Sequence, residues 1–376
     1  MKVLIATGLY PPEIGGPATY SAMIEEMLPS CGIETQVFPF GRVRHYPKIV
    51  RHIIYTYKLW KGSRKMDIIY ALDPISVGLP ALIVARLRRK PFLIRLGGDY
   101  AWEQGRVRFG LTETLDEYIT KKTPRPLFVT LLAVLQTFVT KRAVSVVAPS
   151  QYLKSVIERW GVSKDKIVVI YSALFLASVK EDREQLRTQF SYTNPTIISI
   201  ARLVPWKGFD ALLRVVLTLL KTYPQLTFII GGDGPEREHL EAETKKLGIQ
   251  DHVRFTGLLE REALAAAVKA ADVFVLNSSY EGLAHQLIEA MHIGTPVVAT
   301  NIGGNPELIE SGVEGFLVPF DDEEAMVDAI KRILDHPETR TRIVQSARGR
   351  SKDFSQSVMF GKIEELLKNT YDSTIT

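Results

Sequence analysis

Short apolar runs alternate with amphipathic helical patterns along almost the whole chain, and this alternation limits the fold more than any other feature of the sequence. Runs such as 91–96 and 273–276 are mostly apolar, which is typical of strands buried on both faces of a parallel sheet. Most runs are followed by a segment whose apolar residues are spaced three and four apart, which predicts a helix. The alternation therefore predicts an α/β protein with parallel sheets covered on both faces.

The predicted elements form two series, which indicates two domains. The first series has strands 2–7, 33–40, 67–72, 91–96, 145–150 and 167–171 and helices 18–28, 49–60, 77–88, 127–140 and 152–160. The second has strands 196–201, 227–230, 253–256, 273–276, 297–300 and 315–318 and helices 209–222, 236–247, 261–270, 284–292, 306–311 and 323–335. A chain of 376 residues suits two domains of about 150 to 200 residues. The polar stretch 178–194 is expected to connect them, and 105–125, which lacks a clear period, is expected to form a long loop or lid.

The charge of the chain is unevenly distributed. Residues 1–150 hold 21 Lys and Arg against 11 Asp and Glu, a net charge of +10, whereas residues 151–376 hold 26 against 31, a net charge of −5. A basic half suggests an anionic partner such as a phospholipid surface or a phosphorylated acceptor, although a merely solvated basic face stays open. The basic residues lack the interleaved aromatic residues of nucleic-acid-binding segments, so no nucleic acid partner is expected.

Cysteine content and hydropathy exclude two further classes of protein. Cys31 is the only cysteine, so no intramolecular disulfide can form, which fits a reducing cytosol. No run of about twenty apolar residues is present, so no membrane-spanning helix is predicted. The histidines show no metal-ligand spacing, and we expect no metal site.

The segment 277–296 carries the clearest functional signal. It follows the apolar run 272–276, turns through glycine and serine, and enters a predicted helix. Glu281 stands just before this helix and Glu289 two turns into it, which would separate the two carboxylates by roughly 12 Å if both were helical. A nucleoside diphosphate that carries a sugar has a similar span. An acid at a helix start also complements the helix dipole, so a purely structural role for either glutamate stays open.

Phosphate-binding groups are predicted beside these carboxylates. The backbone N–H groups of Gly282, Leu283 and Ala284 are expected to open the helix and face phosphates. Upstream, Arg202 ends a predicted strand and Lys207 precedes the next helix. A guanidinium fork and an ammonium point charge at one strand–helix junction suit a diphosphate.

Together these motifs make the chain resemble the family 4 retaining glycosyltransferases of the GT-B fold, over nearly its whole length. The matching motifs are, in chain order, Gly15-Gly16, Arg202 with Lys207, the turn from Gly231 to Pro235, and Glu281 with Glu289. The resemblance implies two Rossmann-like domains that face each other across a cleft. Residues 1–175 would bind the acceptor and 176–351 the sugar nucleotide, and a C-terminal helix of about 352–376 would pack back on the first domain.

The resemblance also implies roles for individual residues. Catalytic residues would be Arg202, Lys207, Glu281 and Asp99, the last because it stands where many members have a histidine. Donor-binding residues would be Gly15, Gly16, Gly232, Gly257, Leu258, Gly282, Leu283, Ala284 and Glu289. The family needs no metal and no cofactor, and the nucleotide sugar is a co-substrate.

The expected activity is therefore transfer of a hexose, with retention, from a UDP- or GDP-sugar to a glycan, a lipid-linked or a small-molecule acceptor. We expect a cytoplasmic enzyme of cell-envelope polysaccharide synthesis that lies peripherally on the inner face of the membrane. Two alternatives stay open, namely a sugar-nucleotide epimerase on the same fold and a non-catalytic protein that binds nucleotide sugars. Turnover that depends on a nucleotide sugar would separate the enzymes from the binding protein.

Overall fold

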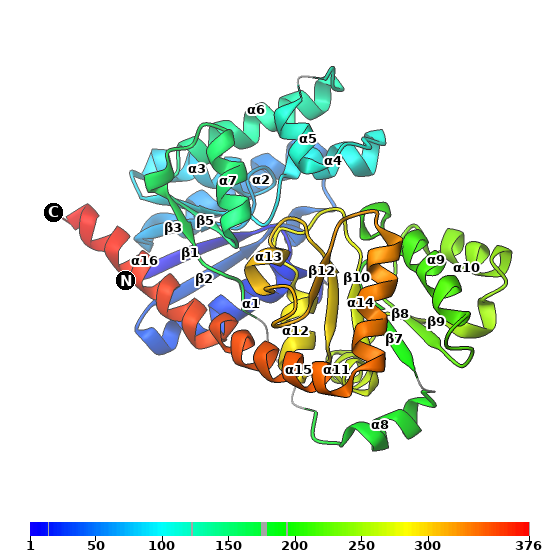
Figure 1. Ribbon diagram of the computed structural model, residues 1–376. Helices are drawn as coiled ribbons and strands as arrows, with labels where there is room; N and C mark the ends of the chain where they lie inside the picture. The colour runs from blue at the N-terminus through cyan, green and yellow to red at the C-terminus, as the bar shows by residue number, and fades with distance from the viewer. Residues whose placement is uncertain (14, 122, 174–178, 193–194, 376) are drawn as a thin grey trace. The chain divides into compact units, whose positions relative to one another are not determined.

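The computed structural model describes residues 1–13, 15–121, 123–173, 179–192 and 195–375, and it divides into two compact units (Figure 1). The N-terminal unit comprises Met1–Ser172 and Ser357–Thr376, and the C-terminal unit comprises Ala173–Gln356. The predicted boundary between residues 175 and 176 lies outside the described residues. Each unit contains one parallel six-stranded sheet, so the predicted α/β class is confirmed.

The sheet of the N-terminal unit has the strand order β2-β1-β3-β4-β5-β6. Its strands are β1 (Lys2–Thr7), β2 (Glu34–Pro39), β3 (Ile68–Ala71), β4 (Phe92–Arg95), β5 (Ser145–Ala148) and β6 (Ile167–Val169). Its helices include α1 (Gly16–Met27), α2 (Lys48–Gly62), α3 (Gly78–Arg88), α6 (Leu127–Lys141), α7 (Gln151–Arg159) and α16 (Gln356–Ile375). All residues of β3, β4 and β5 are buried, which explains why these strands are apolar or nearly so.

The predicted loop over 105–125 is wrong, because most of this stretch is helical. Helix α4 (Tyr100–Phe109) covers its start, and α5 (Leu115–Thr120) follows. Thr114 and Glu117 form a reciprocal capping box at the start of α5, and the T-x-x-E spacing was a sequence signal for it. Trp102 of α4 is fully buried, so packing rather than a long apolar period holds these short helices.

The sheet of the C-terminal unit has the order β12-β11-β10-β7-β8-β9. Its strands are β7 (Thr196–Ile200), β8 (Thr227–Gly231), β9 (Val253–Gly257), β10 (Val273–Leu276), β11 (Val297–Thr300) and β12 (Phe316–Val318). Its helices are α8 (Arg183–Phe190), α9 (Phe209–Leu220), α10 (Arg237–Lys246), α11 (Arg261–Ala270), α12 (His285–Ile293), α13 (Asn305–Leu308), α14 (Glu323–Asp335) and α15 (Pro337–Ser351). The core includes Leu213, Phe228, Val298 and Ile330.

Helix α8 lies in the stretch 178–194, which the sequence predicted to connect the two domains. Its anchoring is ionic as well as apolar: Arg183 and Arg187 of α8 contact the buried carboxylate of Asp272, which Arg340 of α15 also contacts. Hydrophobic periodicity gives no sign of such an anchor. No helix in the described part of the chain is both long and apolar enough to cross a bilayer.

The strand order of the C-terminal sheet reverses between β7 and β10. From β7 the chain proceeds through β8 and β9 on one side, and from β10 through β11 and β12 on the other. The loops that leave the carboxyl ends of β7 and β10 therefore diverge, and open α/β sheets bind ligands at such a point.

Candidate active site

Hydrogen bonds join the loops that follow β7 and β10 at this switch point. The N–H of Ser279 donates to the carbonyl of Trp206 at 2.8 Å, and the side-chain amide of Asn277 donates to the carbonyl of Gly208 at 3.1 Å. Gly208 has a φ of 64°, and an added Cβ would collide with the Asn277 carbonyl. Only glycine fits this position without a shift, so the loop after β7 can lie directly against the loop after β10.

Lys207 and Glu281 meet where these loops touch, although 74 residues separate them in sequence. Their charged ends form an ion pair, and their side chains are only 11% and 9% exposed. The hydroxyl of Ser278, which is fully buried, donates to the same carboxylate oxygen of Glu281 at 2.6 Å. A positive and a negative group thus lie side by side with little solvent to screen them.

The loop after β8 completes one side of the site. An added Cβ at Gly232, whose φ is 121°, would collide with the carbonyl of Ala201. The loop after β8 can therefore lie directly against the loop after β7. Arg202, which follows Ala201, is exposed, so its guanidinium is accessible to an anion.

Two of the predicted donor-binding residues, Gly257 and Leu258, lie at the end of the neighbouring strand β9. The N–H of Gly232 donates to the carbonyl of Gly257 at 2.8 Å, which links the ends of β8 and β9. Leu258 follows and is 65% exposed. An exposed apolar side chain beside backbone polar groups is suited to the flat face and the edge of a nucleobase.

The helix predicted over 284–292 is observed one residue later, but the prediction that Gly282, Leu283 and Ala284 open it is wrong. Helix α12 begins at His285 and Ala284 is its N-cap, so Gly282 and Leu283 belong to the preceding turn. The N–H groups that open the helix therefore come from residues after Ala284. Because Glu281 is not helical, the estimate of its separation from Glu289, which assumed one helix, does not apply.

The glycine pair Gly303-Gly304 supports the loop that carries Glu281. The N–H of Gly304 donates to the carbonyl of Glu281 at 3.0 Å, and an added Cβ at Gly303 would collide with that same carbonyl. Gly304 is the N-cap of α13, and the buried side-chain amide of Asn305 donates to the Thr300 carbonyl at 2.9 Å. The turn that contains Gly303 and Gly304 therefore provides a backbone support for the site.

Glu289 lies in α12 and is partly buried. Burial raises the pKa of its carboxyl to about 7, although the nearby Arg261 lowers it. A carboxyl whose pKa is raised by folding lowers the free energy of unfolding when it ionises, because the folded state favours the protonated form. Such strongly shifted pKa values are common in functional sites, and Glu289 lies in the helix that follows the switch-point strand β10.

Replacing Glu289 with glutamine is expected to weaken donor binding by about 1.5 to 3 kcal/mol, because an ionised acceptor for ribose hydroxyls is lost. The affinity of wild type for the donor should fall as pH drops below about 7, the pKa of Glu289. The affinity of Glu289→Gln for the donor should not change over this range. The variant should also melt at a higher temperature than wild type at pH 8, since it removes a buried charge. Calorimetric titration from pH 5 to 8 measures the donor affinity, and thermal melts over the same range measure the stability. Glu262→Gln, at an exposed position, is the control. Equal donor affinity of wild type and Glu289→Gln at pH 8 would exclude Glu289 as the group that binds the ribose.

The remaining predicted residues lie in the N-terminal unit. Gly15 is the N-cap of α1, which begins at Gly16. Asp99 is 1% exposed, and one carboxylate oxygen accepts the N–H of Trp102 and the side-chain amide of Gln136, each at 2.9 Å. These contacts make Asp99 the N-cap of α4, and its catalytic role stays a prediction.

Sequence reasoning missed a carboxylate at the switch point of the N-terminal sheet, where β1 and β3 diverge. Asp73 follows β3 and accepts the N–H groups of Ile75 and Ser76 at 2.9 and 2.6 Å, while its second oxygen faces Gly8 after β1. Burial raises the pKa of Asp73 to about 6, although these backbone N–H groups lower it. Its place at the end of a strand was the available signal.

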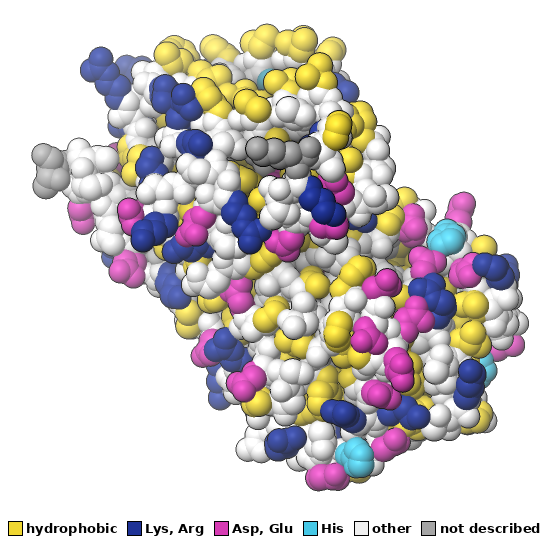
Figure 2. All heavy atoms as spheres, turned by 45° about the horizontal axis from the view of Figure 1, so that its top comes forward, with side chains coloured by type: hydrophobic (Ala, Val, Ile, Leu, Met, Phe, Trp, Pro, Cys, Tyr) yellow, Lys and Arg dark blue, Asp and Glu magenta, His cyan; other side chains and the backbone are white. Residues whose placement is uncertain are grey.

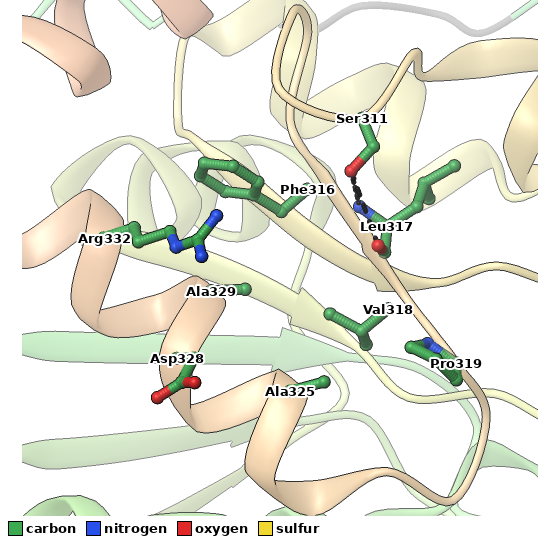
Figure 3. Close-up of a pocket in the computed structure, with 9 residues that line it drawn as sticks. All are labelled: Ser311, Phe316, Leu317, Val318, Pro319, Ala325, Asp328, Ala329 and Arg332. Atoms are coloured by element: carbon green, nitrogen blue, oxygen red, sulfur yellow. Dashed lines mark hydrogen bonds between the residues drawn. The ribbon is translucent and has the colours of Figure 1, made fainter.

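Two other features of the C-terminal unit do not involve the predicted residues. Figure 3 shows a hollow of about 240 Å³ between β12 and α14, lined by residues such as Phe316 and Arg332. Asp210, Glu236 and His239 form one cluster of potential metal ligands among the described residues. His239 pairs with Asp210 at 2.7 Å at the surface, which accounts for the arrangement without a metal.

Comparison with known proteins gives the same assignment for both halves of the chain. Residues 9–174 match the family model described as Glycosyltransferase Family 4, and residues 180–350 match the model described as Glycosyl transferases group 1. The chain is 31% identical over 172 residues to alpha-D-kanosaminyltransferase of Streptomyces kanamyceticus, which covers 46% of this chain and 45% of that protein. It is 35% identical over 147 residues to the lipopolysaccharide core biosynthesis glycosyltransferase LpsD of Rhizobium meliloti, covering 39% and 41%.

These alignments span less than half the length of each curated relative. The structural similarity extends further. HepE of Anabaena, solved in complex with UDP-glucose, superimposes with a TM-score of 0.79 over 98% of this chain and 100% of that one, at 22% identity. At that identity the similarity establishes the fold.

Proposed function

Because the chain belongs to the family 4 glycosyltransferases, we propose that it transfers a hexose from a UDP- or GDP-sugar to an acceptor hydroxyl with retention of anomeric configuration. The observation that carries this proposal is the buried pair of Lys207 and Glu281 at the switch point, with Arg202 exposed on the same loop. The transferred sugar is bonded directly to the leaving phosphate. A donor-binding site therefore needs a cation and a carboxylate next to each other.

In the proposed reaction, the acceptor oxygen forms a bond to the anomeric carbon while the bond from that carbon to the diphosphate oxygen breaks. Lys207, Arg202 and backbone N–H groups near the start of α12 stabilise the negative charge that develops on the diphosphate. Attack occurs on the face from which the diphosphate leaves, and a phosphate oxygen takes the acceptor proton. The products are the glycoside and the nucleoside diphosphate, and no metal or cofactor takes part.

The donor is bound along the carboxyl ends of the strands. Glu281 holds hydroxyls of the sugar and Glu289 those of the ribose, while Leu258 and the backbone around Gly257 seat the base. Gly232 keeps the loop after β8 close enough for its backbone to approach the diphosphate. The glycines of the N-terminal unit, Gly15 and Gly16, are proposed to approach the donor in the same way.

Two alternatives are distinguished by their products. A sugar-nucleotide epimerase on this fold would release an isomerised sugar nucleotide without any acceptor. A non-catalytic binding protein would bind the nucleotide sugar and leave it unchanged. The family membership favours transfer over both.

The acceptor is proposed to be a glycan, a lipid-linked or a small-molecule hydroxyl. LpsD is named for lipopolysaccharide core biosynthesis, which supports a role in cell-envelope polysaccharide synthesis. The net positive charge of the N-terminal half supports a location at the cytoplasmic side of an anionic membrane.

Saturation-transfer NMR with a panel of UDP- and GDP-sugars tests the donor assignment. We expect saturation of the base, the ribose and one hexose, and loss of the ribose signal in Glu289→Gln. Each donor that binds is then incubated with candidate acceptors, and release of nucleoside diphosphate is measured. If saturation is transferred to none of the sugar nucleotides, the proposal is contradicted.

A further inference from the structure

Three neighbouring helices of the N-terminal unit leave large apolar side chains exposed. Helix α2 packs beside α3, and α3 beside α6. The exposed side chains are Ile49, Val50, Ile53, Tyr57 and Trp60 on α2, Ile83 and Leu87 on α3, and Leu127, Phe128, Leu131, Val134 and Phe138 on α6. We call this surface the α2–α3–α6 face. Soluble monomers rarely expose so many large apolar side chains together, and such patches mark interaction sites.

Helix α6 carries the longest apolar stripe of this face. Four of its exposed apolar residues are spaced four, three and four apart, namely Leu127, Leu131, Val134 and Phe138, and they are 41% to 85% exposed. This spacing places them along one side of the helix. The opposite side, which includes Val129 and Val139, is buried in the unit. No charged residue occurs in α6 before Lys141, so this helix is apolar on both sides.

The charge of the same three helices is of one sign. Helices α2, α3 and α6 contain seven lysines and arginines and no aspartate or glutamate. The Arg88 guanidinium lies 4.4 Å from the Trp60 ring centroid, and that of Arg142, just after α6, lies 3.5 Å from the centroid of Phe138. Cations that lie over aromatic rings at the edge of an apolar surface are placed as at a membrane interface.

We propose that the α2–α3–α6 face docks on an anionic lipid leaflet, with the stripe of α6 buried among the acyl chains and the basic residues at the phosphates. This inference deepens the proposed function, because it names the surface at which an acceptor in or on a membrane would be reached. A second copy of the chain is disfavoured as the occupant. A symmetric dimer through this face would bring the seven basic residues of each copy together, whereas an anionic leaflet complements them.

Figure 2 shows the corresponding surface in side-chain colours. Hydrophobic side chains gather at the top of this view, with Lys and Arg close by, in the region where Figure 1 draws α3 and α6. A helix with this character lies in the interface plane and does not span the bilayer.

Vesicle flotation with the full chain and no substrate tests the proposal. Binding is expected with phosphatidylcholine vesicles that contain phosphatidylglycerol, and not with phosphatidylcholine alone. It should weaken at least tenfold as salt rises from about 0.1 to 1 M, because the Debye length falls from about 10 to 3 Å. Trp60 fluorescence should be quenched by lipids brominated on the acyl chain, and the quenching should disappear in Trp60→Phe.

Matched variants separate insertion from simple charge attraction. Leu131→Gln with Val134→Gln keeps the charge and is expected to reduce binding tenfold or more. Its control is Val313→Gln with Phe320→Gln, which removes two exposed apolar residues of the C-terminal unit and should bind normally. Lys61→Gln with Arg86→Gln should weaken binding to anionic vesicles, and Lys245→Gln with Lys246→Gln should not.

Three results would overturn the proposal. The first is equally low binding to anionic and neutral vesicles. The second is full binding by the folded Leu131→Gln, Val134→Gln variant together with absent Trp60 quenching. The third is a lipid-free dimer in sedimentation velocity that this variant dissociates, since the face would then join two copies. None of these readouts depends on the sugar donor. The proposed glycosyl transfer is tested separately, by measuring the release of nucleoside diphosphate with a water-soluble acceptor.

Discussion

Replacing Lys207 with glutamine is expected to lower kcat by about a hundredfold or more, with a smaller change in donor affinity. The ammonium counters negative charge that develops on the leaving diphosphate, and removing one such preorganised group typically costs a factor of about 100 to 1,000 in rate. In the structure this ammonium already pairs with Glu281. Donor binding would therefore redistribute an existing charge pair rather than bring a solvated lysine into place.

The pairing makes the two residues interdependent. Lys207→Gln leaves the Glu281 carboxylate without its counter-charge, so part of the loss would come from a disturbed loop. The double variant Lys207→Gln, Glu281→Gln should therefore lose less than the sum of the two single losses, as contacting residues do. Lys221→Gln, an exposed lysine just after α9, is the control and should keep full turnover. Wild-type kcat in folded Lys207→Gln would remove Lys207 from the mechanism.

Replacing Asp272 with alanine is expected to destabilise the C-terminal unit by about 3 to 5 kcal/mol, which is the range for breaking a buried ion pair. Asp272 is 5% exposed. Its carboxylate accepts the N–H of Thr196 at 2.8 Å and contacts Arg183, Arg187 and Arg340. Its removal leaves Arg187, which is also buried, without this counter-charge. Urea denaturation measures the loss.

The effect should depend on pH in a defined direction. Burial raises the pKa of Asp272, but the N–H of Thr196 and the three guanidinium groups outweigh burial and hold it below its usual value. A carboxyl whose pKa is lowered by folding contributes stability above its unfolded pKa of about 4 and loses it as pH falls through the folded pKa. The difference between wild type and Asp272→Ala should therefore narrow below about pH 4. Asp328→Ala, at an exposed position of α14, should stay within about 0.5 kcal/mol of wild type at every pH.

Hydrophobic pattern was sufficient to predict central strands such as β3, β4 and β10 because these are buried on both faces. Strand β10 is apolar throughout, and the segment predicted from its pattern is the segment observed. Short polar helices were not predictable in this way. Helix α8 is anchored in part by arginines that reach Asp272, more than eighty residues away in sequence, and α5 by a capping box. Such anchors depend on tertiary contacts or on single residues, and hydrophobic periodicity does not detect either of these.

For the site, the motifs indicated which residues to examine but not how they contact each other. The pairing of Lys207 with Glu281 follows from the strand order, which places β7 beside β10, and no local pattern reports that order. The roles of Gly208 and Gly303 also appear only in three dimensions, because each is defined by a carbonyl oxygen from a distant loop. Leu283 was expected in α12 because it continues the apolar spacing of Leu287 and Met291, although it lies before the helix begins.

Hydrogen exchange measured by mass spectrometry, with and without a sugar nucleotide that binds, tests most directly whether the switch point of the C-terminal sheet is the donor site. The account predicts slower exchange in the loops after β7, β8 and β10, at residues 201–208, 232–235 and 277–284, together with Gly303 and Gly304. Exchange at the hollow between β12 and α14 should not change. Protection at that hollow, with unchanged exchange in the loops that carry Lys207 and Glu281, would contradict the account.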